Sequence, residues 1–577
     1  MKRNWFSNIK FSFAALLIAS AAGSALASCS DETYEGDTPK DWAGTSDVFV
    51  STDETGFSTY FNPAVGRVGD PMPYYDKNNE EFRILYLQEY DLNGASYHPM
   101  WGVATKDGGN YTALGEILPA GGAAEQDAGV GTGCCYYSVK DELYYIYYTG
   151  HNGACAQTEA VMRATSKDGI HYTKDMVWML RGVTDDFNKI DFRDPQIFEE
   201  GGKYHMIIST RPVKGGNPVF AEYVSDNMKD WTKADQFNML WERMYECPDV
   251  FQMGDWWYIV YSDSNKRNWG RDVKYIKAHS WAELKSLFAD AGYIDQNQKS
   301  LDSRAFYAGK TASNGTDRYI WGWCPFRSGQ DLWQKNNNAG GSFDDSKDVE
   351  PNWSGSLVCH KIIQHEDGTL TLGEVPGIRA KYNKTAEVKV MKSEGAEISG
   401  NEVTLKGDDA YVLYNRLGYH NHISFTVKTS NNWDKFGISL VRGSDNVYID
   451  PKKYDEHIDD AMNSSDLNPS RFYTMVVNPE DENWRKINFE EEGTFMWGDK
   501  KEKSGRGFIP GISSYGFSRP ADNTYKVDIY TDNSVMVMYI NDNVCYTNRI
   551  YGIQKNCWSI NNYGGSVTVS NVTVTQY

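Results

Sequence analysis

Arg193-Asp194-Pro195-Gln196-Ile197-Phe198 begins a pattern that occurs three times in this chain. An acidic residue lies beside a proline, a short apolar strand follows, and a polar turn leads into an aromatic-rich strand, here residues 201–208. The other copies begin at Gly69-Asp70-Pro71 and at Glu246-Cys247-Pro248. Short strands between turns, in repeats of roughly 50 to 60 residues, are typical of propeller blades. The sequence predicts an all-β fold with a β-propeller, and spacing alone does not give the blade number.

The acidic residue of each copy opens a strand, so Asp70, Asp194 and Glu246 are expected at the same place in the repeat. The first strand of a propeller blade lines the central channel. Equivalent positions in different blades therefore converge, and we expect the three carboxyl groups to meet at one end of the channel. Proline is tolerated at a strand start because no ladder donor is needed there. The alternative is that each acid only caps a turn.

The composition of the 577 residues restricts the domain number and the partners. A chain of this length contains two or more domains. A formal net charge of −20 argues against nucleic acid or an anionic membrane surface as the main partner, because both bind to basic patches on a protein surface. The 18 Trp and 39 Tyr suit the stacking of sugar rings on aromatic faces. Strand-rich proteins also use many aromatic residues for packing alone.

The C-terminal part of the chain alternates apolar and polar residues in short segments. Residues 411–414, 422–427 and 566–569 show this period of two, which favours antiparallel strands in a sandwich. We therefore predict a propeller domain over residues 59–380 and a β-sandwich over residues 381–577.

The N-terminus has the features of a secretory signal over residues 1–28. Basic residues precede an apolar run over residues 11–22, which is too short for a structural transmembrane helix. The segment ends in Leu26-Ala27-Ser28-Cys29, which resembles the bacterial lipobox, in which Cys29 would be lipidated. Residues 29–58 then form a polar tether. We expect a protein anchored to the bacterial outer membrane only through this lipid and facing outward; ordinary cleavage without lipidation is the alternative.

An ordered set of phrases between residues 60 and 375 resembles glycoside hydrolase family 32, the invertase, inulinase and levanase group. In chain order these phrases are Asp70-Pro71, Gln88, Trp101-Gly102-Val103-Ala104-Thr105, Gly131-Thr132-Gly133-Cys134, Tyr148-Thr149-Gly150, Arg193-Asp194-Pro195, Glu246-Cys247-Pro248, Phe306-Tyr307-Ala308 and Trp321-Gly322-Trp323. The resemblance implies a five-bladed β-propeller followed by a β-sandwich. It also implies a retaining hydrolase that cleaves the β-fructosidic bonds of fructans of the levan or inulin type.

The resemblance also assigns roles to the three carboxylates. Asp70 would be the nucleophile and Glu246 the acid/base, a pair that cleaves glycosides with retention through a covalent intermediate. Asp194, kept ionised by Arg193, would stabilise the transition state. The residues expected to bind substrate are Gln88, Trp101, Gly131, Thr132, Arg193 and Trp321. No metal or cofactor is expected, and a monomer is expected.

The sequence departs from the family pattern around the nucleophile. Gly69 and Met72 replace asparagines, while Val68 and Ser96 stand where larger residues are usual. Smaller or less polar residues would open the channel mouth, so internal cleavage of a fructan chain is expected over removal of terminal fructoses.

These replacements also keep two other functions open. One is a surface glycan-binding lipoprotein without catalysis, and the other is an arabinanase-like or xylosidase-like propeller glycosidase. A Ca²⁺ site among the carboxylates is a weaker alternative, because Glu246 lacks an Asp/Asn cluster nearby.

Overall fold

A computed structural model describes the chain from Thr59 onward, with gaps. The described residues are 59–63, 67–92, 95–240, 244–265, 270–303, 305–327, 351–408, 410–432, 434–441, 472–479, 486–490, 515–516, 519–533, 535–549 and 557–577. The predicted signal peptide, the tether and Cys29 lie outside them. No helix among the described residues has the length and hydropathy needed to cross a membrane.

The first part of the chain folds into consecutive antiparallel units of four strands, each a meander. The first unit contains β1 (Arg67–Asp76), β2 (Glu81–Leu92), β4 (Met100–Thr105) and β5 (Thr112–Leu118), with β3 (Ala95–Tyr97) paired to β2. The second contains β6 (Gly129–Ser138), β7 (Leu143–His151), β8 (Glu159–Ser166) and β9 (Thr173–Leu180). After the 3₁₀ turn η3 (Gly182–Asp185), the third contains β10 (Phe187–Glu200), β11 (Lys203–Pro212), β12 (Val219–Ser225) and β13 (Thr232–Asn238).

Two further units complete this part. The fourth contains β14 (Tyr245–Met253), β15 (Trp256–Asn265), β16 (Gly270–Ala278) and β17 (Lys299–Ser300), with the helices α2 (Trp281–Leu287) and α3 (Ala291–Asn297) before β17. The last contains β18 (Tyr307–Ser313), β19 (Arg318–Arg327), β20 (Pro351–Gln364) and β21 (Leu370–Gly373).

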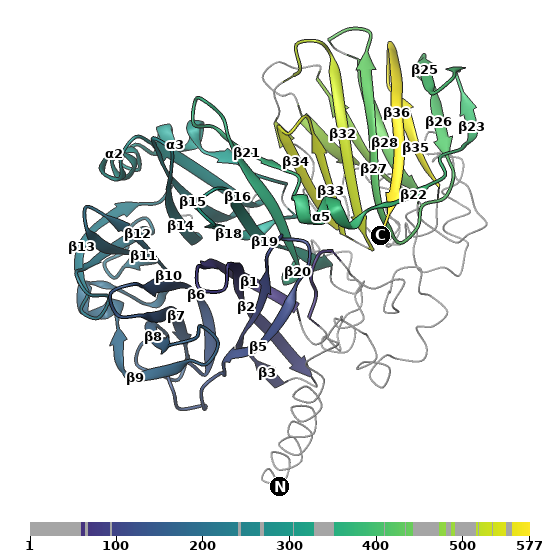
Figure 1. The fold of residues 1–577 in the computed structure, drawn as a ribbon. Coiled ribbons are helices and arrows are strands. Elements are labelled where there is room, and N and C mark those ends of the chain that lie inside the picture. Colours follow the sequence, from purple (N-terminus) through teal and green to yellow (C-terminus); the bar gives the residue numbers. More distant parts are fainter. Residues whose placement is uncertain are drawn as a thin grey trace, which may run out of the picture.

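The opening strands of the units contact one another in a ring. β1 contacts β6, β6 contacts β10, β10 contacts β14, β14 contacts β18, and β18 returns to β1 (Figure 1). One bridge between Val68 and Gly355 also joins β1 to β20, so the last unit connects with the first. This arrangement is that of a β-propeller, with the opening strands around its axis.

Each of these opening strands carries a β-bulge at a corresponding position. The register shifts lie between Gly69 and Met72 in β1, Gly131 and Gly133 in β6, Arg193 and Gln196 in β10, Glu246 and Asp249 in β14, and Tyr307 and Lys310 in β18. Asp70, Asp194, Cys247 and Ala308 have positive φ within these bulges. A bulge removes ladder hydrogen bonds and turns a side chain out of the strand's alternation, so it sets the direction of the residues at this end of the channel.

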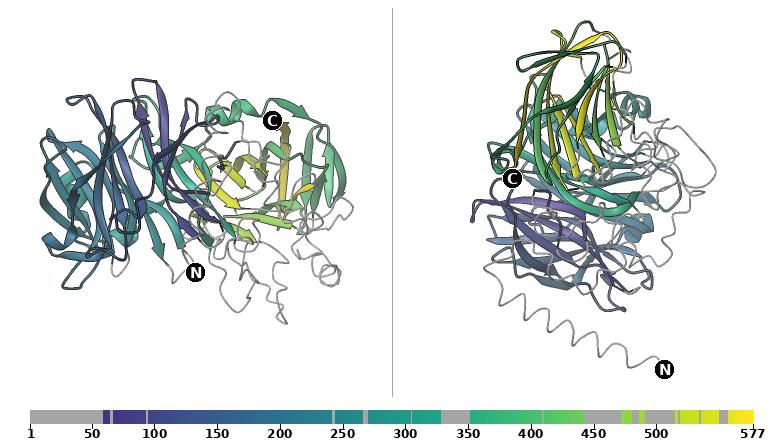
Figure 2. Two further views of the ribbon diagram at one scale, coloured as in Figure 1. Left: turned by 90° about the horizontal axis from the view of Figure 1, so that it is seen from below. Right: turned by 90° about the vertical axis from the view of Figure 1, so that its right-hand side faces the viewer.

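After α5 (Pro376–Lys381), the chain forms two sheets that face each other (Figure 2). The first has the order β24 (Ala396–Ser399), β25 (Glu402–Lys406), β36 (Ser566–Gln576), β27 (His420–Thr429), β32 (Thr524–Asp532), β33 (Val535–Ile540) and β34 (Val544–Arg549), with β22 (Lys384–Ala386) paired to β36. The second has the order β23 (Val390–Glu394), β26 (Tyr411–Tyr414), β35 (Trp558–Asn562), β28 (Phe436–Val441), β29 (Phe472–Asn478), β30 (Lys486–Glu490) and β31 (Tyr515–Gly516). Two packed antiparallel sheets make a β-sandwich, as the sequence predicted.

The propeller and the sandwich share one hydrophobic core. A single cluster of buried side chains runs from Leu357 and Ile362 in β20 to Val535 and Val537 in β33. Buried polar groups cross the same boundary, since Asp302 accepts hydrogen bonds from the Thr547 backbone N–H at 2.8 Å and its hydroxyl at 2.5 Å. The two domains therefore pack as one body rather than as separate units on a linker.

Candidate active site

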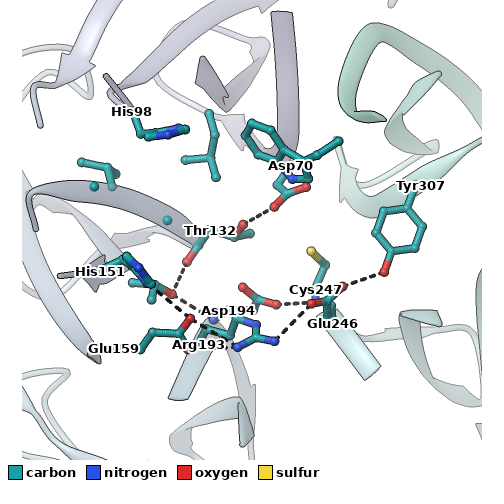
Figure 3. A pocket seen from close by; sticks show the side chains of 16 residues that line it. Asp70, His98, Thr132, His151, Glu159, Arg193, Asp194, Glu246, Cys247 and Tyr307 are labelled. Carbon is teal, nitrogen blue, oxygen red and sulfur yellow. Dashed lines mark hydrogen bonds and ion pairs between the residues drawn. The ribbon is translucent and has the colours of Figure 1, made fainter. Parts of the chain in front are cut away.

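A cavity of about 360 Å³ lies where the bulges of the opening strands meet (Figure 3). The structure brings Asp70, Asp194 and Glu246 together around it, although they are far apart in the sequence. The other lining residues are Leu87, His98, Gly129, Val130, Gly131, Thr132, Thr149, His151, Glu159, Arg193, Cys247, Tyr307 and Trp353. The predicted convergence of the three acids is thus present, at the mouth of the channel.

Asp70 is held at both carboxylate oxygens. The Thr132 hydroxyl donates to Oδ2 at 2.7 Å, and the Trp323 indole N–H donates to Oδ1 at 2.9 Å. The backbone at Asp70 has a φ of 25°, which aspartate tolerates better than most side chains. Two donors on one carboxylate fix its orientation, as a nucleophile requires.

Glu246 also has a partner on each oxygen. The Tyr307 hydroxyl donates to Oε2 at 2.7 Å, and Arg193 Nη2 donates to Oε1 at 3.2 Å. Only about a quarter of the Glu246 side chain is exposed, at 26%. Tyr307 lies in Phe306-Tyr307-Ala308, one of the phrases that resemble family 32, but the resemblance assigned no role to it.

The structure corrects the expectation that all three acids take the same place in the repeat. Asp70 and Asp194 are bulge residues with positive φ, but in β14 the corresponding residue is Cys247. Glu246 precedes the bulge, at the place of Gly69 in β1 and Arg193 in β10. This one-residue offset separates Glu246 from the two aspartates in position.

Asp194 lies deepest of the three acids, with 4% of its surface exposed. Its Oδ2 accepts the Cys247 backbone N–H at 2.8 Å. Burial raises the pKa of Asp194 to about 7; Glu246 and Asp70 act in the same direction, and Arg193 and the Cys247 hydrogen bond oppose them. The sequence predicted that Arg193 would keep Asp194 ionised, and here burial outweighs that attraction.

Arg193 instead links the other acids at the rim. Its Nη1 donates to Asp191 at 2.8 Å and to Glu159 Oε2 at 3.1 Å, and its Nη2 reaches Glu246. Burial opposes the charge of the guanidinium, but Glu159, Glu246 and Asp194 raise the pKa of Arg193. Glu159 is the first residue of β8, and no motif surrounds it in the sequence. Its position at the site could therefore not be predicted from the sequence.

Family models match both domains. Residues 60–367 match "Glycosyl hydrolases family 32 N-terminal domain", and residues 368–468 and 462–574 match "GH32, BT1760-like, C-terminal domain". The chain belongs to glycoside hydrolase family 32. The resemblance seen in the sequence is therefore confirmed, and so is the expectation of a glycoside hydrolase acting on β-fructosides. The arabinanase-like, xylosidase-like and non-catalytic alternatives were wrong.

Two curated proteins are similar to this chain. Sucrose-6-phosphate hydrolase of Escherichia coli is 25% identical over 394 residues, 64% of this chain and 72% of that protein. Levanbiose-producing levanase of Bacillus subtilis is 24% identical over 240 residues, 40% of this chain and 42% of that protein.

Two solved structures share the fold of this family 32 chain. They are sucrose-6-phosphate hydrolase from Lactobacillus gasseri (TM-score 0.62, 14% identity, 91% of this chain and 93% of that one) and fructan 1-exohydrolase IIa from Cichorium intybus (TM-score 0.62, 12% identity, 91% of this chain and 97% of that one).

The structure of this family 32 enzyme separates the predicted substrate-binding residues into two groups. Gly131, Thr132 and Arg193 line the cavity. The others do not: Gln88 is 2% exposed, Trp101 packs against the main core, and Trp321 is fully buried against Phe82 and Tyr319. Residues two apart in a strand share a face, so the two tryptophans differ in their position along β19. Trp323 lies opposite Tyr307 and donates to Asp70, whereas Trp321 lies opposite Lys310.

The replacement of asparagine by Gly69 does not leave an open space. A Cβ on Gly69 would lie 2.4 Å from Cζ2 of Trp353, so the indole ring occupies the volume that a side chain would take. Val68 and Met72 are buried at 0% and 1% exposure, and the Met72 sulfur accepts the Gly133 N–H at 3.1 Å. The expectation of a channel mouth widened at these positions is wrong, because Trp353 and local packing fill it; the side chain of Ser96 lies outside the described residues.

Proposed function

We propose that this enzyme is a retaining β-fructosidase that cleaves fructans of the levan or inulin type. The observation that carries the proposal is the arrangement of Asp70 and Glu246, two carboxyl groups that line one cavity, each held by two donors. We also propose that the propeller has five blades, whose first strands are β1, β6, β10, β14 and β18.

The residues of the cavity can perform the reaction in two steps. Asp70 attacks the anomeric carbon of the fructosyl unit while Glu246 transfers its proton to the departing glycosidic oxygen, which leaves a fructosyl ester on Asp70. Glu246, now a carboxylate, then takes a proton from water as the water attacks the ester, and Asp70 is released. Asp194, beside both groups, accepts hydrogen bonds from sugar hydroxyls, and no metal or cofactor takes part in this scheme.

The charge of the cavity favours a neutral sugar over a phosphorylated one. Four carboxyl groups line it, those of Asp70, Glu159, Asp194 and Glu246. The guanidinium of Arg193 already bonds to carboxylates of three residues, Glu159, Asp191 and Glu246. The net negative charge of the cavity would repel a phosphate dianion. We therefore expect unphosphorylated fructans to be better substrates than sucrose 6-phosphate, the compound after which two of the relatives are named.

A substrate panel tests the proposal. Purified protein lacking residues 1–29 is incubated with levan, inulin, sucrose, sucrose 6-phosphate, arabinan and xylan, and released sugars are measured. We expect turnover of levan or inulin, and losses on the order of 10²-fold or more in Asp70→Asn and Glu246→Gln. Early products separate internal cleavage, which releases oligosaccharides first, from terminal cleavage, which releases fructose alone. Faster turnover of sucrose 6-phosphate than of any fructan would reject the proposed substrate class.

We also propose that Cys29 is lipidated and anchors the enzyme to the outer membrane, with the catalytic domain outside the cell. The support is the Leu26-Ala27-Ser28-Cys29 phrase and the polar tether after it. Phase partitioning of whole-cell extracts in Triton X-114 tests this proposal. The wild type should enter the detergent phase and Cys29→Ala the aqueous phase, and recovery of both in the aqueous phase would contradict it.

A further inference from the structure

Thr149 places one hydroxyl between the backbones of two bulges. It lies in β7 and is 3% exposed. Its Oγ1 donates to the Thr132 carbonyl at 2.9 Å and accepts the Asp194 backbone N–H at 3.0 Å. Although Thr149 borders the cavity, its proton is committed to a protein partner, so its role is within the protein.

The two hydrogen bonds of Thr149 pair the Thr132 carbonyl and the Asp194 N–H, backbone groups that lie in bulges, where the regular hydrogen bonds between strands are interrupted. Thr132 is the bulge residue of β6, and its hydroxyl donates to Asp70 Oδ2 at 2.7 Å. Asp194 is the bulge residue of β10, with a φ of 61°. One threonine side chain therefore ties together the residue that orients Asp70 and the backbone that carries Asp194.

The surroundings hold Thr149 in this position. It pairs with Gly131 in β6 and with Val161 in β8, so its strand is fixed on both sides. A Cβ on Gly131 would lie 2.9 Å from the Thr149 Cβ, which shows how closely the two strands approach. Lys310 anchors the other end of the β6 bulge, because its ammonium donates to the Gly133 carbonyl at 2.8 Å.

We propose that Thr149 is a positioning residue that sets the spacing between Asp70 and Asp194. The inference rests on the proposed function, in which Asp70 attacks the sugar and Asp194 accepts its hydroxyl groups. Valine has the shape of threonine but can make neither hydrogen bond. Thr149→Val should lower kcat on the order of 10- to 100-fold, because a shift of about 1 Å in a reacting group costs up to about 10²-fold. KM should change little, since the hydroxyl is not needed for substrate binding.

The experiment compares kcat and KM on the best fructan for the wild type, Thr149→Val, Thr149→Ser and Thr311→Val. Serine keeps the hydroxyl and should restore most of kcat. Thr311 is a matched control: it is 7% exposed, its hydroxyl bonds to Asp249 at 2.6 Å, and it does not line the cavity. Wild-type kcat in Thr149→Val, or equal losses in the serine and valine variants, would overturn the role of Thr149.

Crystal structures of the wild type and Thr149→Val provide a readout that does not depend on activity. We expect the Asp194 bulge to move away from β7 in the variant while the rest of the propeller keeps its position. Unchanged positions of Asp70 and Asp194 would overturn the inference. A wild type that turns over no β-fructoside would reject the proposed function instead, and the crystallographic comparison would still decide whether Thr149 spaces the two acids.

Discussion

Asp194 is a residue whose protonation is coupled to folding. Burial raises its pKa from the ordinary 3.8 to about 7, so the folded protein binds this proton more tightly than the unfolded chain does. The associated stability is fully present below about pH 4 and is lost progressively as the pH rises to about 7. Above that value the folded protein carries the full cost of a buried carboxylate.

Asp194→Asn should remove this pH-dependent cost. Asparagine is neutral at every pH, so the variant should gain melting temperature relative to the wild type between pH 5 and pH 7, with no further gain by pH 8. Differential scanning calorimetry at pH 5, 7 and 8 measures the difference. A constant difference across this range would show that Asp194 does not titrate there. Activity should be lost at pH 8, where the wild type has an ionised carboxylate with two acceptor oxygens and the amide offers only one.

Gly69 and Trp353 are in close contact, and no sequence motif predicts this contact. The ring of Trp353 fills the volume beside Gly69, 284 positions earlier in the chain. Gly69→Ala should destabilise the fold by about 1–3 kcal/mol, because the added methyl would force the indole to move. Chemical denaturation measures this cost.

A double-mutant cycle gives the control for this pair. In a Trp353→Ala background, Gly69→Ala should cost much less, which corresponds to a coupling energy of about 0.5–3 kcal/mol. Equal costs in both backgrounds would mean that the indole does not restrict residue 69.

The bulges are the elements that convert a propeller strand into part of an active site. The sequence predicted the strands from the recurring acid and proline, but it also placed each acid at a strand start. The structure corrects this, because β10 already begins at Phe187 and Asp194 lies in its interior. The sequence could not predict the bulges, because a bulge is a difference in register between two strands and leaves no local pattern. The same limit explains why Glu246 was placed at the same repeat position as the aspartates.

Gly133 shows how strictly the β6 bulge depends on one residue. A Cβ there would lie 1.9 Å from the Tyr147 carbonyl oxygen, a backbone atom that cannot turn aside. Gly133→Ala should destabilise the protein by about 3 kcal/mol or more and lower activity through Thr132 and Asp70. Gly153→Ala is the matched control, since nothing lies within 4 Å of its Cβ position. Similar unfolding curves for the two variants would contradict the role given to Gly133.

At the scale of the whole molecule, the sequence located the propeller and the sandwich but did not show how firmly they are joined. Alternation of apolar and polar residues identifies strands, whereas contacts such as those between β20 and β33 depend on three-dimensional packing. Asp302 is an example: it precedes β18 in a segment without a motif, yet it accepts two hydrogen bonds from Thr547 across the domain boundary. Within its own domain, its Oδ2 lies 3.0 Å from His360 Nε2 in β20. The propeller and the sandwich therefore share one packed core, which could not be read from the sequence.

Asp302→Ala should test whether the two domains unfold together. The substitution leaves the buried Thr547 N–H without its acceptor, and a buried donor without a partner costs about 1–3 kcal/mol. If the shared core couples the domains, calorimetry of the wild type should show one transition, and the variant should show the same single transition at a lower temperature. Asp226→Ala is the control, because Asp226 is 81% exposed and lies 3.7 Å from its only ion-pair partner in the described structure, Lys203, so the change should stay within about 0.5 kcal/mol. The wild type would contradict this expectation if it showed two separate transitions, of which Asp302→Ala displaced only one. The propeller and the sandwich would then be stable independently of their interface.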